Sequence, residues 1–179
     1  MAVGTSAQTP VLAVAAGSTT VTATLGSTPT TGNIIVAIAS ATSTFGTLSI
    51  SGTGWTQITG SPWDTGADVR VAAWWKPADS TTGYTVTSSS NDNLALMLDE
   101  RPGLSAVPLL DTTAPVKVSM TSSGASIGYG SFTPAAADTV TYYVLVVQAN
   151  PGGSGPTIPG AFTALPAWAN RRMNVGSAI

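Results

Sequence analysis

The sequence contains no histidine and no cysteine among its 179 residues. Without an imidazole or a thiol, neither a Ser-His-Asp triad nor a Cys-His pair can be assembled, which excludes the common nucleophilic hydrolases. Zinc sites built from His and Cys are excluded for the same reason, as are disulfide bonds. We therefore expect a protein that is not an enzyme and that has no catalytic residues and no cofactor.

Charged residues are scarce as well, at 8% of the chain, against about 25% in an average soluble domain. Six Lys and Arg residues stand against eight Asp and Glu residues, so the net charge is -2. Six scattered cations cannot form the basic patch that nucleic acid requires, and no nucleic-acid partner is expected. No strictly apolar run is longer than six residues, the length of Tyr142 to Val147. This is far short of the about 20 residues of a spanning helix, so we expect no membrane insertion.

Hydroxyl side chains take the place of the missing charges. There are 20 Ser and 28 Thr residues, together 27% of the chain, and 43% of the residues are hydrophobic. A chain with this apolar content and almost no net charge is expected to fold. Because its solubility depends on hydroxyl groups rather than on charges, the composition indicates a protein that packs among neighbours. The N-terminus has no basic start and no sustained apolar stretch, so it does not predict a secretory signal.

Alternation with a period of two residues and β-branched side chains dominate the whole sequence, and no segment shows a helical apolar stripe. The chain length corresponds to one domain, residues 1–179, in which 1–14 form an N-terminal arm or the first strand. Many short strands separated by Gly and Pro turns predict an all-β fold, a sandwich or a barrel. The predicted strands are Val11–Ala15, Thr19–Leu25, Asn33–Ala41, Leu48–Ser51, Thr56–Thr59, Asp68–Lys76, Tyr84–Ser88, Leu94–Arg101, Val116–Thr121, Ser126–Phe132, Thr139–Gln148, Phe162–Leu165 and Arg171–Ala178.

Two predicted strands are apolar on both faces. In Ile34–Ala39 and in Tyr142–Val147 both alternating sets of side chains can be buried, which is typical of strands in the middle of a sheet. The core set of the first strand is Ile34, Val36 and Ile38. In the strand Asp68–Lys76 the two faces differ, so Trp75 is predicted to lie in the core and Trp74 at a surface or an interface.

A weak internal duplication relates residues 32–76 to residues 137–176. Each copy has an apolar strand, a loop, an aromatic residue before Thr (Trp55 and Phe162), a loop containing Pro, and a strand with Arg. The second copy has no counterpart of Tyr84–Arg101. Two sources of the closing strand stay open, namely Val11–Leu25 of the same chain and a strand of another chain.

Five motifs follow one another in a characteristic order, namely Gly32–Ala39, Gly54–Ile58, Val69–Lys76, Tyr84–Thr87 and Pro108–Asp111. This order resembles the concanavalin A-like β-sandwich domains that recur in surface proteins of tailed bacteriophages, and that also occur in large secreted bacterial repeat proteins. The resemblance covers about residues 15–178 and implies an antiparallel β-sandwich of the jelly-roll kind. It also implies a virion structural module, either a head decoration or a tail-associated domain. At Arg101-Pro102-Gly103 the sequence departs from the family's usual Gly-Val-Asp.

Carboxylates are candidates for catalysis or for metal binding. Asp99 and Glu100 are adjacent on a predicted strand and point to opposite sides, so they cannot flank one glycosidic bond. Calcium binding suits loop carboxylates better than glycoside hydrolysis does. The candidate calcium ligands are Asn91-Asp92-Asn93, and Asp64 with Asp68. The alternative, which we favour, is that these residues form turns.

Aromatic residues are candidates for a second kind of site. Trp63, Trp74, Trp168, Tyr142 and Tyr143 could form a platform on which sugars stack. The alternative is that Trp55 and Trp75 fill the core while the other aromatic side chains are buried at subunit contacts. The pair Arg171-Arg172 is too small for nucleic acid. The run Gly152-Gly153-Ser154-Gly155 lacks the Lys and the strand–helix setting of a phosphate-binding loop and is interpreted as a flexible loop.

Together these features predict a non-enzymatic structural protein on the surface of a tailed-phage virion, made in the host cytoplasm. Its expected partners are the major capsid or tail proteins and further copies of the chain, a trimer being one arrangement. It would bind through neutral faces that are easily desolvated. The alternative function is a carbohydrate-binding adhesion module that recognises a glycan on the host surface.

Overall fold

The structure is a computed structural model that describes residues 6–42, 46–58, 60–64 and 69–102, together with the backbone of 141–146, 163–164 and 173–178. Every regular element in these ranges is a β-strand, as the alternating sequence predicts. The strands are β1 (Val11–Thr24), β2 (Ile34–Thr42), β3 (Leu48–Ile50), β4 (Thr56–Gln57), β5 (Trp63–Asp64), β6 (Val69–Pro77), β7 (Gly83–Arg101), β8 (Thr141–Val146), β9 (Thr163–Ala164) and β10 (Met173–Ala178).

Most predicted strands are present, with two differences in how they are divided. The predicted pairs Val11–Ala15 with Thr19–Leu25, and Tyr84–Ser88 with Leu94–Arg101, each form one long strand, β1 and β7. The short strand β5 was not predicted. Two further predicted strands, Val116–Thr121 and Ser126–Phe132, lie outside the described residues.

Seven strands form one antiparallel sheet in which β1, β7, β2, β6 and β4 are successive neighbours. The short strand β3 pairs with β7, and β5 pairs with β6. β2 lies in the middle of this sheet and all nine of its residues are buried, which confirms the prediction made from its two apolar faces.

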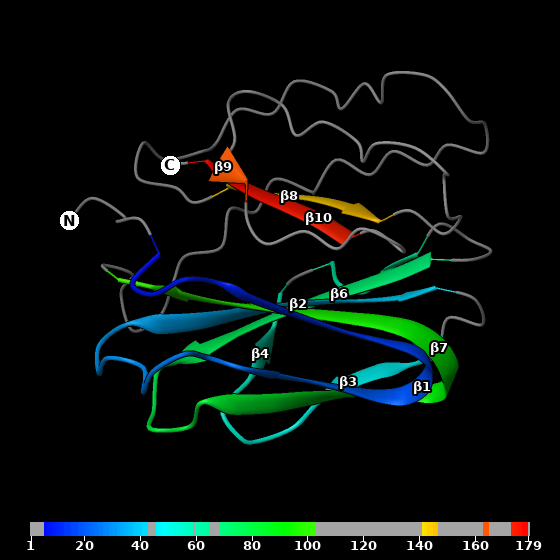
Figure 1. Ribbon diagram of the computed structural model, residues 1–179, viewed down its shortest axis with the longest axis horizontal. Coiled ribbons are helices and arrows are strands. Elements are labelled where there is room, and N and C mark those ends of the chain that lie inside the picture. Colours follow the sequence, from blue (N-terminus) through cyan, green and yellow to red (C-terminus); the bar gives the residue numbers. More distant parts are fainter. Residues whose placement is uncertain are drawn as a thin grey trace.

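The large sheet bends back on itself along β1 and β7 (Figure 1). Its register shifts between Ala15 and Ser18 and again between Ser18 and Thr20, and between these points Gly17 adopts a φ of 56°, which favours glycine. Beyond the shifts, the second half of β1 and the first half of β7 form a lower layer with β3. The first half of β1 and the second half of β7 form an upper layer with β2 and β6.

The bend creates a core between the two layers of the same sheet. Its buried side chains come from the lower layer (Val21, Ala23, Leu25, Tyr84 and Val86) and from the upper layer (Ile35, Ala37, Ala39, Ala41, Ala72, Trp74, Leu94, Leu96 and Leu98). We call this set the larger cluster.

A second set of buried side chains occupies the opposite face of the upper layer. This smaller cluster consists of Ile34, Val36, Ile38, Ala73, Trp75, Ala95 and Met97. Its members alternate along the strands with those of the larger cluster, as the pleat of a strand requires. The predicted core residues Ile34, Val36 and Ile38 are therefore confirmed as core, on this face.

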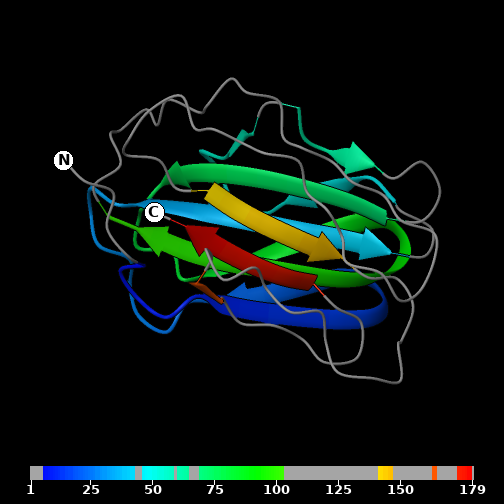
Figure 2. The same ribbon diagram turned by 90° about the horizontal axis from the view of Figure 1, so that it is seen from above.

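Strands β8, β10 and β9 form a separate antiparallel sheet in that order. It lies above the upper layer, on the side away from β3 (Figures 1 and 2). Among the described strands β8 pairs only with β10, and a place for Tyr142–Val147 in the middle of a sheet stays a prediction. Likewise, β1 pairs with β7 and not with β8 or β10, so Val11–Leu25 does not close the second copy there.

Candidate functional site

Glu100 lies buried near the end of β7 and joins two distant segments of the chain to this strand. Its carboxylate accepts hydrogen bonds from Gln8 Nε2 (2.5 Å), from Asn33 Nδ2 (2.5 Å) and from the backbone N–H of Thr30 (2.7 Å). Burial raises the pKa of Glu100, but the bonds from Gln8, Asn33 and Thr30 outweigh burial and leave this pKa below its ordinary value. A carboxylate with three donors holds the segment before β1 and the start of β2 against β7.

Its neighbours in β7 form a second buried pair. Arg101 Nε donates to Asp99 Oδ2 at 2.6 Å, and the two side chains are 2% and 0% exposed. Glu100 lies between them in sequence but uses different partners, because successive side chains of a strand point to opposite faces. Asp99 and Glu100 therefore do not converge on a common site. This is the outcome predicted from their adjacent positions on one strand.

Lys76 is buried at the end of β6 within a polar and aromatic cluster. Its Nζ lies 2.5 Å from Asp79 Oδ2, 5.7 Å from the centre of the Trp55 ring and 5.3 Å from the centre of the Tyr84 ring. The two rings meet edge to face at 5.0 Å, and the Tyr84 hydroxyl donates to Asp79 Oδ1 at 3.1 Å. Two attractive ring contacts and one ion pair thus stabilise this buried ammonium group.

The ion pair makes the protein sensitive to acid. The bond from Lys76, helped by donors on Thr81 and Tyr84, lowers the pKa of Asp79 to about 2 against the opposing effect of burial. Because this pKa is below the about 3.9 of an unfolded Asp, the stabilisation is present above about pH 4 and is lost as the pH falls toward 2. The side chain is 47% exposed, so solvent screening limits its contribution to less than about 1 kcal/mol.

We therefore expect the melting temperature to fall between pH 6 and pH 2, and to fall less in Asp79→Asn. Circular dichroism melts of both proteins across this range measure the difference. Identical pH profiles for the two proteins would contradict the role given to Asp79.

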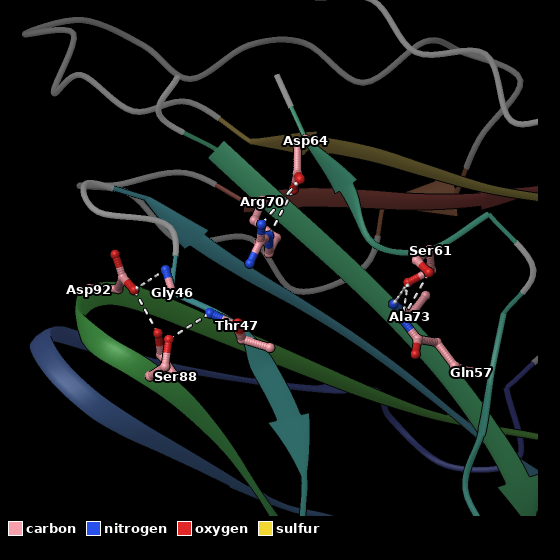
Figure 3. Close-up of polar contacts among 10 residues, drawn as sticks. Gly46, Thr47, Gln57, Ser61, Asp64, Arg70, Ala73, Ser88 and Asp92 are labelled. Carbon is pink, nitrogen blue, oxygen red and sulfur yellow. Dashed lines mark hydrogen bonds and ion pairs between the residues drawn. The ribbon is translucent and has the colours of Figure 1, made fainter. Parts of the chain in front are cut away.

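Two further acids are also engaged within the chain (Figure 3). Asp64 binds Arg70 through both oxygens, at 2.8 Å to Nε and 3.2 Å to Nη2. Asp92 is buried where β7 bends, and its Oδ2 accepts from the N–H of Gly46 (2.9 Å), from Ser88 Oγ (2.6 Å) and from Ser90 Oγ (3.0 Å).

These donors leave little room for calcium at the predicted ligands. In the described ranges no three acidic residues come together as metal ligands would. Asp68, the proposed partner of Asp64, lies outside the described residues. Asn91, Asp92 and Asn93 lie within strand β7, so the prediction that they form a turn is wrong. Asp92 instead stabilises the bend of β7.

Each charged side chain in the part of the chain that the structure describes is bound to other groups of the same chain, and the side chains of Asp64 and Asp79 remain 37% and 47% exposed. In addition, Asp64 is the first charged residue of the sequence, so strands β1 to β4 carry no charge at all. This uneven distribution of charge is visible in the amino-acid sequence alone.

The outer face of the lower layer carries hydroxyl groups in rows. Thr20, Thr22 and Thr24 of β1 are exposed and alternate with the buried Val21 and Ala23. Across the strands, Thr20 lies opposite Thr87 of β7, and Thr87 lies opposite Ser49 of β3. The hydroxyls of Thr22 and Thr85 bond to each other at 2.7 Å, and Ser51 Oγ accepts from the Thr85 N–H at 2.8 Å. We call Thr20, Thr22, Thr24, Thr85, Thr87, Ser49 and Ser51 the hydroxyl face.

The structure separates the aromatic candidates. Trp74 is 6% exposed and belongs to the larger cluster, so its predicted surface position is wrong. Trp75 is 8% exposed and packs in the smaller cluster, as a core residue should. Trp55 is half-buried against the larger cluster, and its Nε1 donates to the Ser51 carbonyl at 2.9 Å.

The other aromatic candidates do not form a platform with Trp74. Trp63, in β5, is half-buried and packs against the smaller cluster, on the face opposite to that of Trp74. Tyr142 and Tyr143 lie opposite Ser177 and Gly176 in the smaller sheet, where only the backbone is described. Trp168 lies outside the described residues, as do Arg171-Arg172 and the loop at 152–155.

No helix in the described ranges is long and apolar enough to cross a membrane. Comparison of the chain with protein-family models, with curated proteins and with solved structures finds no match.

Proposed function

We propose that the chain is a non-enzymatic structural module that attaches to the outer surface of a tailed-phage virion, as a head decoration or a minor tail component, and self-associates there. The family resemblance suggests this setting. The observation that supports a binding role most directly is the hydroxyl face, an uncharged surface formed by rows of Thr and Ser side chains.

Neutral hydroxyl rows favour attachment by surface complementarity. Each hydroxyl can both donate and accept a hydrogen bond, so it can adapt to polar groups of a capsid or tail protein. Burying hydroxyls with partners costs much less than burying charges, because charges lose far more hydration. The exposed positions on β1, β7 and β3 alternate with buried or partly buried ones. Packing of these inward side chains against the larger cluster therefore holds the hydroxyl face in one shape.

For the fold we propose a concanavalin A-like, jelly-roll sandwich with an internal duplication. Two features support it. The three strands of each copy have the same order, β2-β6-β4 and β8-β10-β9, and all neighbours are antiparallel. The cross-strand rows also correspond: Val36, Trp75 and Thr56 in the first copy, and Tyr142, Ser177 and Thr163 in the second.

Attachment is tested by co-sedimentation of the purified chain with phage heads that lack it and with tail tubes. We expect binding to one of these two particles, and we expect Thr22→Glu with Thr87→Glu on the hydroxyl face to reduce it at least tenfold. Ser80→Glu, in the exposed loop before β7, is the matched control and is expected to bind normally. A chain that binds neither particle would overturn the proposal.

The adhesion alternative makes a different prediction. If the chain binds a host glycan through aromatic stacking, Trp63→Ala is expected to lower affinity for cell-wall polysaccharide in calorimetric titration, with no change in binding to particles. Burial of Trp74 removes one ring from that platform, so we place this function second.

A further inference from the structure

The two edge strands of the upper layer differ in whether further segments of the chain pair with them. β6 borders one side and β1 borders the other. An uncovered edge strand presents unpaired backbone N–H and C=O groups and is a template for pairing with another strand. The state of each edge therefore indicates where a second chain can add.

The β6 edge is closed by short segments of the same chain. β5 pairs with it at Val71 and Arg70, and β4 pairs with it at Trp75 and Trp74. Between these points, the Ala73 carbonyl accepts from the Ile58 N–H at 2.9 Å, and the Ala73 N–H donates to Ser61 Oγ at 2.9 Å (Figure 3). No room is left on this side for a further strand.

Among the described strands, β1 pairs only with β7 over Val11–Ala15, so its other edge is open there. These five residues pair with Leu98 to Leu94 of β7 on one side, and no backbone hydrogen bond joins their other side to any described residue. The next part of the strand is irregular and uses local side chains, since the Gly17 N–H donates to Asn93 Oδ1 and the Thr20 N–H donates to Ser18 Oγ. The regular open edge thus ends before Gly17.

The side chains of this edge extend both hydrophobic clusters. Val11, Ala13 and Ala15 pack against the larger cluster, whereas Leu12 and Val14 pack against the smaller one. All five are only partly buried. A strand added beside them would complete their burial on both faces. Along Thr20–Thr24 an added strand would not do so, because one face of that part of β1 carries exposed hydroxyls.

The chemistry of the edge fits a second copy of the same edge. When two identical strands pair antiparallel about a two-fold axis, each residue meets residues of its own segment, so any charge would meet a like charge. Residues 1–63 contain no charged residue. Natural sheets often protect an open edge with Lys, a proline or an inward charge, and Val11–Ala15 has none of these.

We propose that Val11–Ala15 of β1 pairs antiparallel with Val11–Ala15 of a second copy, which joins the two upper layers into one continuous sheet. The proposal rests on the self-association that the proposed function includes, but not on attachment to a particle. A closed ring built from edges needs two different open edges on each copy. Within the upper layer β6 is closed, so this layer offers one open edge among the described strands, which favours a two-fold pair over a trimer.

The test places charge at the centre of the segment. Ala13 is its middle residue, so a two-fold axis through the segment brings Ala13 next to its own copy. Sedimentation equilibrium from micromolar to millimolar concentration is expected to show a dimer for the unmodified chain and a monomer for Ala13→Glu and for Ala13→Lys. An equimolar mixture of these two variants is expected to dimerise again, because opposite charges then meet.

Ser80→Glu and Ser80→Lys are the matched controls, and both are expected to dimerise like the unmodified chain. If the Ala13 variants do not fold, Ala16→Glu places a charge at an exposed position beside the same segment and is expected to give a monomer. A monomeric unmodified chain, a trimer, or charge variants that still dimerise would each overturn the pairing. A dimer that fails to bind heads or tail tubes would overturn the proposed function alone.

Discussion

Replacing Trp74 with alanine is expected to lower the free energy of unfolding by about 3–5 kcal/mol, the cost typical of removing a large buried aromatic side chain. Trp74 is 6% exposed in the larger cluster and lies between Ala37 of β2 and Gln57 of β4. The small side chain of Ala37 cannot fill the cavity left behind. Urea unfolding followed by circular dichroism measures the loss.

Trp74→Phe is the control, because it keeps most of the ring volume and is expected to cost less. A domain of this size has a total stability of about 5–15 kcal/mol, so the alanine variant should be visibly destabilised at room temperature. If Trp74→Ala unfolds at the same urea concentration as the unmodified chain, the placement of Trp74 in the core is contradicted.

The second large effect is expected at Glu100. In Glu100→Met the volume is nearly kept, but the donors on Gln8, Asn33 and Thr30 lose their common acceptor. Each buried donor left without a partner costs about 1–3 kcal/mol, less where water can reach it. We therefore expect the free energy of unfolding at pH 7 to fall by about 3 kcal/mol, measured by denaturant titration.

Glu100→Gln distinguishes the loss of hydrogen bonds from the loss of side-chain packing. Its amide keeps one acceptor oxygen in nearly the same shape, so its loss of stability is expected to be smaller than that of Glu100→Met. Equal stability of Glu100→Met and the unmodified chain would show that the three bonds do not hold the segment before β1 in place.

Much of the fold could be predicted from local patterns. β2 is buried on both faces, and the run Ile34–Ala39, which is apolar at every position, showed this directly. The union of two predicted strands into β1, and of two others into β7, could not be seen locally. The polar residues at Gly17-Ser18 and Ser88–Asn91 are typical of turns, yet here they form the bend where both strands pass together from one layer to the other.

The assignment of the two tryptophans shows the limit of alternation. Alternation correctly predicts that Trp74 and Trp75 lie on opposite faces of β6. It led to a wrong position for Trp74 because one face was assumed to meet solvent or a partner. In the structure the sheet folds over one face and a second sheet lies above the other, so both rings are buried.

The distant partners of the charged side chains could not be predicted from the sequence. Glu100 binds residues 67 to 92 positions away, and these contacts depend on the order of strands in the sheet. By contrast, the pairing of Lys76 with Asp79 is local, since they are three positions apart. The sequence showed that charge is scarce, and the structure adds that the described charged groups are bound to other groups of the same chain.

The central claim is that this chain binds its partners through a neutral surface, and the salt dependence of attachment tests it most directly. Co-sedimentation with phage heads or tail tubes that lack the chain is measured at about 50 mM and about 500 mM NaCl, which changes the Debye length about threefold. We predict that the chain attaches with equal strength at both salt concentrations. Attachment that weakens by tenfold or more at high salt would show that charges carry the contact and would contradict it.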